Sequence, residues 1–167
     1  FYTMCQKQSL ILLEDVKLPN FEYIKNNICE RLGKLTYQKN PKEAMEYLSN
    51  AIVSAQNKQN ESKVVELSGY LIQSCKIAQN YTAIVETVDA VLAIYSKPKQ
   101  DLQRALIKTR KLEALLQLGN WSEIASIVNN EVNPVLQEFL KHPKKNDFAS
   151  VREVYETWIM SNIILAE

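Results

Sequence analysis

Apolar residues recur at intervals of three and four along most of the chain. The first clear series contains Phe21, Ile24, Ile28, Leu32 and Leu35. Spacing of this kind places side chains on one face of an α-helix that packs against a neighbour. No convincing run alternates with the period of two that a strand requires, so the pattern predicts an all-α fold. Comparable series contain Ala44, Leu48, Ala51 and Ala55; Val64, Leu67, Leu71, Cys75 and Ala78; Ile84, Val88, Val91 and Tyr95; and Leu102, Leu106, Thr109, Leu112 and Leu116.

Capping residues mark where these helices begin. Asn40-Pro41-Lys42-Glu43 offers an N-cap, a proline for the first helical position and the glutamate of a capping box. Asn120-Trp121-Ser122-Glu123 repeats the pattern without the proline, and Ser150-Val151-Arg152-Glu153 opens the last helix in the same way. The expected helices span residues 2–15, 21–37, 41–58, 61–79, 81–95, 99–118, 121–130, 134–141 and 151–166.

The chain also contains an internal repeat. Asn40, Asn80 and Asn120 are evenly spaced, and each precedes a helical series. A repeat of about 40 residues, built from antiparallel helix pairs, is typical of an α-solenoid; it exceeds the roughly 34 residues of tetratricopeptide (TPR) repeats. We therefore expect residues 1–167 to form a single TPR-like helical-repeat domain. Matching apolar columns contain Leu32, Ile72 and Leu112; Ala44, Ile84 and Ile124; and Leu48, Val88 and Val128.

Three asparagines match the pattern of a glycosylation acceptor, namely Asn60, Asn80 and Asn120. Asparagine is favoured at helix starts because its side chain caps backbone N–H groups. We therefore interpret Asn40, Asn80 and Asn120 as structural residues of the repeat junctions. Trp121 is expected to fill a gap between helix pairs rather than to stack on a ligand.

The residue types that carry catalysis are sparse. His142, the one histidine, lies in a charged loop far from any cysteine, and Gly119 suits the left-handed end of a helix rather than a phosphate loop. We expect no catalytic, cofactor-binding or metal-binding residue, and no enzyme. Cys5, Cys29 and Cys75 are odd in number and set in apolar series, which is typical of reduced core thiols of the cytoplasm or nucleus.

The charge balance narrows the classes of partner. With 20 basic and 19 acidic residues the net charge is +1, which favours neither nucleic acid nor an anionic membrane. Lys97, Arg104, Lys108 and Lys111 recur at three, four or seven residues. They are candidates for a basic stripe that binds an acidic protein surface; the alternative is a solvated helix face.

Three stretches carry a resemblance to a known family. They are "PKEAMEYLSNAIVSAQNKQN" (41–60), "VVELSGYLIQSCKIAQNYTAIVETVDAVLAI" (64–94) and "RALIKTRKLEALLQLGNWSEIASIV" (104–128). Over residues 22–167 the chain resembles the helical-repeat region of PCI-domain scaffold subunits, the family shared by the proteasome lid and the COP-nine signalosome. The last helix, "SVREVYETWIMSNIILAE" (150–167), is similar to the helix that leads into the PCI domain of that family.

The resemblance implies a right-handed solenoid arm without an active site, which contacts other protein subunits of a multisubunit complex. It also implies an excerpt of a longer chain, in which a PCI-type domain follows. We therefore expect a cytoplasmic or nuclear protein-interaction scaffold with no small-molecule substrate. Two alternatives stay open: a stand-alone TPR-like peptide-binding adaptor, and a helical-repeat segment of a large kinase-like protein.

Overall fold

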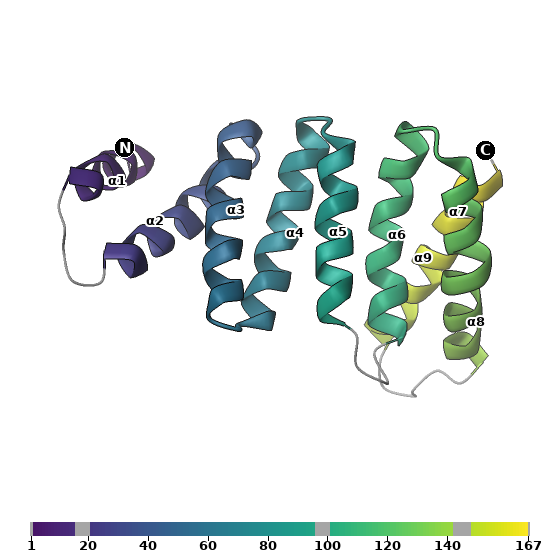
Figure 1. Ribbon diagram of the computed structural model, residues 1–167. Helices are drawn as coiled ribbons and strands as arrows, with labels where there is room; N and C mark the ends of the chain where they lie inside the picture. Colours follow the sequence, from purple (N-terminus) through teal and green to yellow (C-terminus); the bar gives the residue numbers. More distant parts are fainter. Residues whose placement is uncertain (1, 16–20, 96–100, 142–147, 167) are drawn as a thin grey trace. The chain divides into compact units, whose positions relative to one another are not determined.

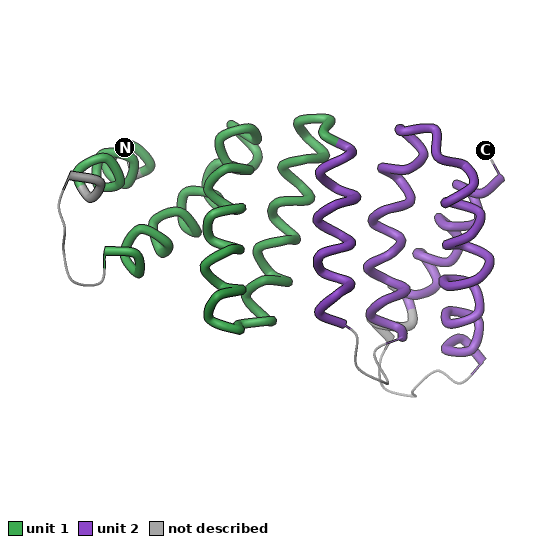
Figure 2. Tube along the Cα trace, viewed as in Figure 1, with its two compact units in different colours: residues 1–80 green, residues 81–167 purple. Residues whose placement is uncertain are grey.

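The computed structural model describes residues 2–15, 21–95, 101–141 and 148–166, and within these ranges every regular element is a helix (Figure 1). The predicted all-α fold is confirmed. The chain divides into two compact units, Phe1–Asn80 and Tyr81–Glu167 (Figure 2). The elements are α1 (Tyr2–Asp15), α2 (Phe21–Thr36), α3 (Pro41–Asn57), α4 (Glu61–Ile77), α5 (Tyr81–Ile94), α6 (Asp101–Gln117), α7 (Trp121–Ile127), the π-helical turn η1 (Val128–Val132), α8 (Asn133–Lys141) and α9 (Phe148–Ala166).

One type of turn connects several of the helices. The N–H of Asn60 donates to the carbonyl of Ala55, and the same bond joins Asn80 to Cys75 and Asn120 to Leu115, at 2.8–3.0 Å. In each turn a second bond joins the N–H of the residue before the asparagine to the carbonyl of the residue after the first acceptor, as from Gln59 to Gln56. The two bonds together form a Schellman motif. The residue before each asparagine is left-handed, with φ of 54°, 56° and 69° at Gln59, Gln79 and Gly119. The expectation for Gly119 is confirmed.

The turns at Asn60, Asn80 and Asn120 each place the next helix directly after the asparagine. Successive helices begin at equal intervals, at Pro41, Glu61, Tyr81, Asp101 and Trp121. The interval from Asn40 to Asn80 that the sequence repeats therefore spans two helices. Asn60 belongs to the same series of turns, which a comparison of Asn40, Asn80 and Asn120 alone does not detect.

The asparagine side chains differ in how they cap. Asn60 Oδ1 accepts from the N–H of Lys63 at 3.1 Å, and Asn120 Oδ1 accepts from the N–H of Glu123 at 3.4 Å. Asn40 makes no such bond; its Nδ2 instead donates to the Glu43 carboxylate at 2.7 Å. The predicted side-chain cap at Asn40 is thus wrong, because the two side chains bond to each other. Glu123 likewise accepts from Asn120 Nδ2 rather than completing a capping box through the backbone.

The core of unit 1 lies among α2, α3 and α4. Ala44, Leu48 and Ala51 of α3 are buried together with Cys29 of α2 and Leu67 of α4. The helix α3 therefore buries its apolar stripe between its two neighbours. Helix α1 contacts α2, and Lys7 Nζ forms an ion pair of 2.6 Å with Glu43 of α3.

Unit 2 is organised around α6, which contacts α5, α7, η1, α8 and α9. Figure 1 shows α9 crossing behind α6, α7 and α8. The helices α7 and α8, predicted as separate elements, follow one another through η1, where the N–H of Asn133 bonds to the carbonyl of Val128. Pro134 lacks an N–H and would clash with the carbonyl four residues earlier in a regular helix. The wider π turn before it lets the helix continue, which is why the predicted break between residues 130 and 134 is wrong.

Two other expectations also differ from the structure. Helix α9 begins at Phe148, ahead of Ser150, so Ser150 lies inside the helix and is not its N-cap. Cys5 of unit 1 is exposed, contrary to the prediction of a core thiol; Cys29 and Cys75 are buried as predicted. In the described ranges, no helix combines the length and apolar composition needed to cross a bilayer.

Two glycines within helices provide a matched test of this packing. A Cβ at Gly33 would lie 2.6 Å from Cγ of Leu48, which is fully buried, whereas a Cβ at Gly69 would meet no atom within 4 Å. We expect Gly33→Ala to lower the free energy of unfolding by roughly 1–2 kcal/mol, since overpacking outweighs the gain in helix propensity. Gly69→Ala should raise it by about 1 kcal/mol. Urea unfolding followed by circular dichroism measures both, and equal effects of the two substitutions would contradict the α2–α3 contact.

Candidate protein-interaction surfaces

The predicted basic stripe does not form an exposed face. Arg104 Nη1 donates to the carbonyls of Leu92 and Tyr95, at 3.2 and 2.6 Å, and so caps the end of α5. Lys108 forms an ion pair with Glu131 of η1. Lys97 lies outside the described residues.

Lys111 is the most enclosed of the predicted stripe. Its exposed fraction is 8%, and its Nζ lies 2.9 Å from Asp89 of α5 and 2.7 Å from Glu123 of α7. Burial acts to lower the pKa of Lys111, but hydrogen bonds to Glu123 and Asp89 outweigh it and raise the pKa above its ordinary value. The ammonium group of Lys111 thus joins α6 to α5 and α7 within unit 2. Arg104, Lys108 and Lys111 are occupied inside the chain, so the interpretation of these three as an exposed partner-binding face is wrong.

The two tryptophans have different environments. Trp121 is the first residue of α7 and is 50% exposed, so its predicted role as a filler between helix pairs is wrong. Ile124 and Val128, which follow it in the chain, are buried as the repeat predicted. Trp158 of α9 packs against the core of unit 2, and its buried Nε1 has no hydrogen-bond partner.

Helix α9 is apolar on two opposite faces. Val154 and Ile164 are buried in the core of unit 2, and Ser161 is buried with them. The outward face carries four large apolar side chains, which we call the α9 outer face. Their exposed fractions are 51% for Tyr155, 41% for Ile159, 50% for Met160 and 48% for Ile163.

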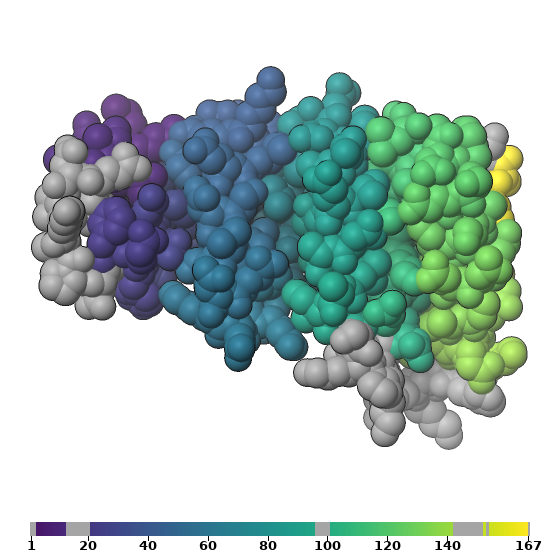
Figure 3. Space-filling view, viewed as in Figure 1, coloured from purple at the N-terminus to yellow at the C-terminus, as the bar shows by residue number. Residues whose placement is uncertain are grey.

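The spacing of the α9 outer face makes it continuous. Tyr155, Ile159 and Ile163 recur at every fourth position, so they lie in one row along the helix. The ring of Tyr155 also meets Trp158 edge to face at 6.0 Å between centroids. Figure 3 shows the helices that precede α9 covering the viewed side of unit 2, with part of α9 visible in yellow at its edge. A signal is present in the sequence, since "WIMSNIILA" has few polar positions, but the sequence does not show which face lies inward.

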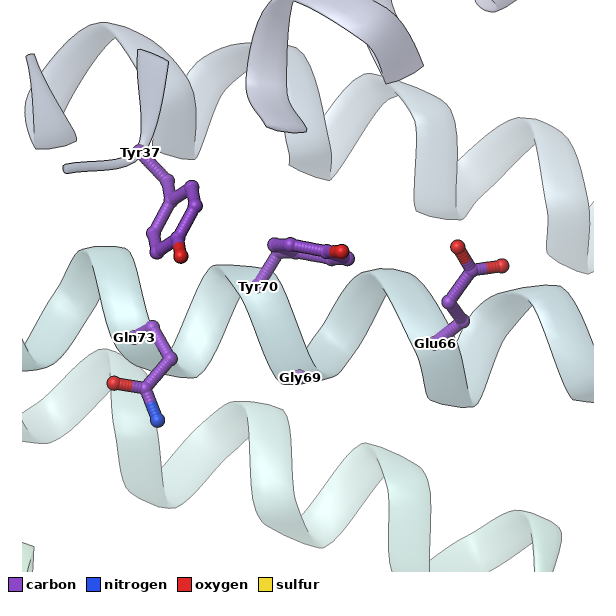
Figure 4. Close-up of a pocket in the computed structure, with 5 residues that line it drawn as sticks. All are labelled: Tyr37, Glu66, Gly69, Tyr70 and Gln73. Atoms are coloured by element: carbon purple, nitrogen blue, oxygen red, sulfur yellow. The ribbon is translucent and has the colours of Figure 1, made fainter. Parts of the chain in front are cut away.

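A small pocket in unit 1 offers a second candidate surface. It is lined by Tyr37, Glu66, Gly69, Tyr70 and Gln73. Figure 4 shows Tyr37 reaching from the end of α2 toward α4, which carries the other four residues. The rings of Tyr37 and Tyr70 meet edge to face at 5.4 Å. This contact joins the end of α2 to α4.

Four alternating charges lie beside this pocket. Lys34 contacts Glu30 and Glu66, and Lys63 contacts the same two carboxylates. Hydrogen bonds from Lys34 and Lys63 lower the pKa of Glu66. Burial raises the pKa of Glu30, but its bonds to the same two lysines outweigh burial and lower it overall. The charges compensate one another, so the pocket rim presents no net charge from this group.

The remaining candidate residues concern metal binding. His142 lies outside the described residues. Within the described part of the chain, no group of three His, Cys, Asp or Glu side chains could hold a metal ion.

No protein-family model, curated protein or solved structure matches the chain. The resemblance to PCI-domain scaffold subunits therefore stays a hypothesis that rests on the residues that carry it. The α9 outer face is the feature of the described structure that points most directly to a function.

The ion pairs of Lys111 lead to a stability prediction. Lys111→Met should lower the free energy of unfolding by about 2 kcal/mol, because the bonds to two carboxylates, those of Asp89 and Glu123, are lost from an enclosed position. The matched control is Lys141→Met, whose exposed pair with Glu138 spans one helical turn and should cost less than about 0.5 kcal/mol. Chemical unfolding measures both; equal losses would contradict the enclosed role of Lys111.

The charge group beside the pocket predicts a pH dependence. Because the pKa values of Glu30 and Glu66 are lowered by folding, their contribution is present above the ordinary value of 4.5 and is lost as the pH falls through their folded values. Lys34→Met should therefore lower stability by about 1 kcal/mol near neutral pH, and the difference from the unmodified chain should shrink below about pH 4. Thermal unfolding from pH 7 to pH 3 measures the difference, and a constant difference would contradict the assignment.

Proposed function

We propose that this chain is a non-catalytic scaffold segment that binds other protein subunits, and that the α9 outer face is the surface through which it does so. The single observation that carries the proposal is the row of Tyr155, Ile159 and Ile163, with Met160 beside it, held outward on a helix whose other face is buried. A helix face that carries a row of large apolar side chains normally packs against another surface.

The size and composition of this face support a binding role. Taking about 200 Å² as the full surface of a large side chain, four half-exposed residues present roughly 400 Å² of apolar surface. Contiguous apolar patches of a few hundred Å² on soluble proteins commonly mark interaction sites. Tyrosine and methionine are also enriched in protein interfaces, whereas lysine and glutamate are depleted.

The arrangement of the helices supports the finer proposal of an α-solenoid. Helix starts recur at equal intervals, three of them directly after the same type of turn, and two such intervals make the period between Asn40 and Asn80. A solenoid presents an extended surface that suits subunit contacts. Together with the family resemblance, this supports a right-handed arm in a complex of the proteasome-lid or signalosome type, in the cytoplasm or nucleus. The interval between helix starts is longer than half of a TPR, which disfavours a stand-alone TPR adaptor.

A pair of matched substitutions tests the proposed function. Ile159→Asp places a charge in the centre of the α9 outer face, whereas Val53→Asp places one on a 54% exposed side chain of α3 in unit 1. We expect proteins that co-purify with the tagged chain from a native extract to be retained by Val53→Asp. Ile159→Asp should reduce their recovery at least tenfold, since burying an unpaired charge in an interface costs more than about 1.4 kcal/mol.

Circular dichroism and thermal unfolding of both variants must first show that the fold is kept. Undiminished recovery of the partners by Ile159→Asp would contradict the assignment of the binding surface to α9. If the unmodified chain retains no protein partner from the extract, the scaffold function itself is refuted.

A further inference from the structure

We propose that the pocket of unit 1 binds a proline-rich segment of a partner protein, which lies across Tyr37 and Tyr70 in the polyproline II conformation. A proline ring of the segment packs against the two tyrosine rings, and backbone carbonyls of the segment accept hydrogen bonds from the pocket. The site belongs to unit 1 alone, because all the residues that line it lie between Tyr37 and Gln73. It is therefore independent of the function proposed for the α9 outer face.

The size of the pocket limits its occupant to a side chain of a longer ligand. Its volume is about 170 Å³, whereas sites that enclose a drug-sized molecule span roughly 300–1,000 Å³. Gly69 belongs to the lining, and a Cβ at that position would meet no atom within 4 Å. Glycine thus leaves room in the lining, where any other residue would place a side chain.

The charges around the pocket favour a neutral occupant. Glu66 lines the pocket, so an anionic ligand would face its carboxylate. Lys34 Nζ lies over the Tyr70 ring, 5.6 Å from its centre, and is ion-paired with Glu66. The chain itself thus supplies the cation that the ring and the carboxylate attract. A cationic ligand would have to compete with Lys34 for both.

The pocket also presents polar hydrogens to a ligand. Gln38 Nε2 donates to the hydroxyl oxygen of Tyr37 at 2.9 Å, which leaves the hydroxyl hydrogen of Tyr37 available to another acceptor. Within the described residues, the Tyr70 hydroxyl and the exposed Gln73 amide have no hydrogen-bond partner. Figure 4 shows the Tyr37 hydroxyl directed toward α4 and the Tyr70 hydroxyl directed toward Glu66. The two donors can therefore serve different carbonyls.

These features match the chemistry of a polyproline II segment. Such a segment makes no internal hydrogen bonds, so its carbonyls are available as acceptors, and its prolines have no N–H groups that need acceptors of their own. Aromatic-lined grooves bind it at low entropic cost because its conformation is present before binding. The rings of Tyr37 and Tyr70 stand at 74° to each other and form two walls for a proline ring. A partner helix would offer no free carbonyls to the donors.

A fluorescent oligoproline decamer tests the site. Its anisotropy should rise saturably with the concentration of the purified chain, whereas a decamer of alternating glycine and serine should show no saturable rise. Gly69→Leu fills the pocket and should weaken binding of the oligoproline at least about tenfold, because the proline ring loses its burial against the tyrosines. The matched control is Ser62→Leu, which adds the same side chain at an exposed position of α4 outside the pocket and should leave the affinity unchanged.

Both variants should keep the circular dichroism spectrum of the unmodified chain, since leucine is a strong helix former. An oligoproline that shows no saturable binding would overturn the proposal, and so would one that Gly69→Leu binds with unchanged affinity. A decamer with arginine or leucine in place of the prolines that binds more tightly, and is released by Gly69→Leu, would overturn the choice of proline.

Removal of single hydroxyl groups tests the hydrogen bonds. Tyr37→Phe and Tyr70→Phe keep the rings and their edge-to-face contact, so each should weaken binding of the oligoproline roughly threefold to tenfold through the loss of one hydrogen bond. Unchanged affinity in both variants would overturn the role of the hydroxyls.

A variant of unit 2 separates this site from the α9 outer face. Ile159→Asp should bind the oligoproline with the affinity of the unmodified chain, whatever its effect on other protein partners. Loss of oligoproline binding with Ile159→Asp but not with Gly69→Leu would place the site in unit 2 and overturn the assignment to the pocket.

Discussion

The hydrogen bond from Asn120 N–H to the carbonyl of Leu115, and its counterparts at Asn60 and Asn80, fixes how the helices follow one another. It ends one helix, while the same asparagine stands immediately before the first residue of the next. Because one residue serves both helices, these three connections are short, and the helix starts from Pro41 to Trp121 are evenly spaced along the sequence. Equal spacing puts the apolar stripe of each helix at matching positions along the sequence. Within each unit, these matching positions are the ones that are buried, which is why the apolar columns of the sequence agree.

The sequence predicts this framework because its signals are local. Helix limits depend on Pro41, on the asparagines and on the apolar period, and these act within a few residues. The errors fall where the outcome depends on a contact that is distant or between side chains. Asn40 bonds to Glu43 instead of the backbone, and Pro134 is accommodated by a π turn that no local pattern marks.

The candidate site is less predictable than the fold, for a physical reason. A helical stripe of Arg104, Lys108 and Lys111 has the same spacing whether it faces water or a neighbouring helix. The acids that bind its lysines, Asp89, Glu123 and Glu131, come from other elements. Trp121 fits a helix start equally well when it points outward. The sequence does not reveal the α9 outer face either, because both apolar faces of α9 resemble core positions and only the packing of unit 2 separates them.

These two features of unit 2 are connected. Three of the basic residues of α6 join α5, α7 and η1 to α6, so the electrostatic attraction of the stripe acts within unit 2 and is not directed at a partner. Among the α9 side chains that the structure describes, the exposed ones are apolar apart from Arg152 and Glu156, which form an ion pair with each other. Association through this face should therefore depend little on salt, because screening weakens interactions between charges and leaves apolar burial nearly unchanged. An interface built on the predicted basic stripe would weaken steeply as salt was raised.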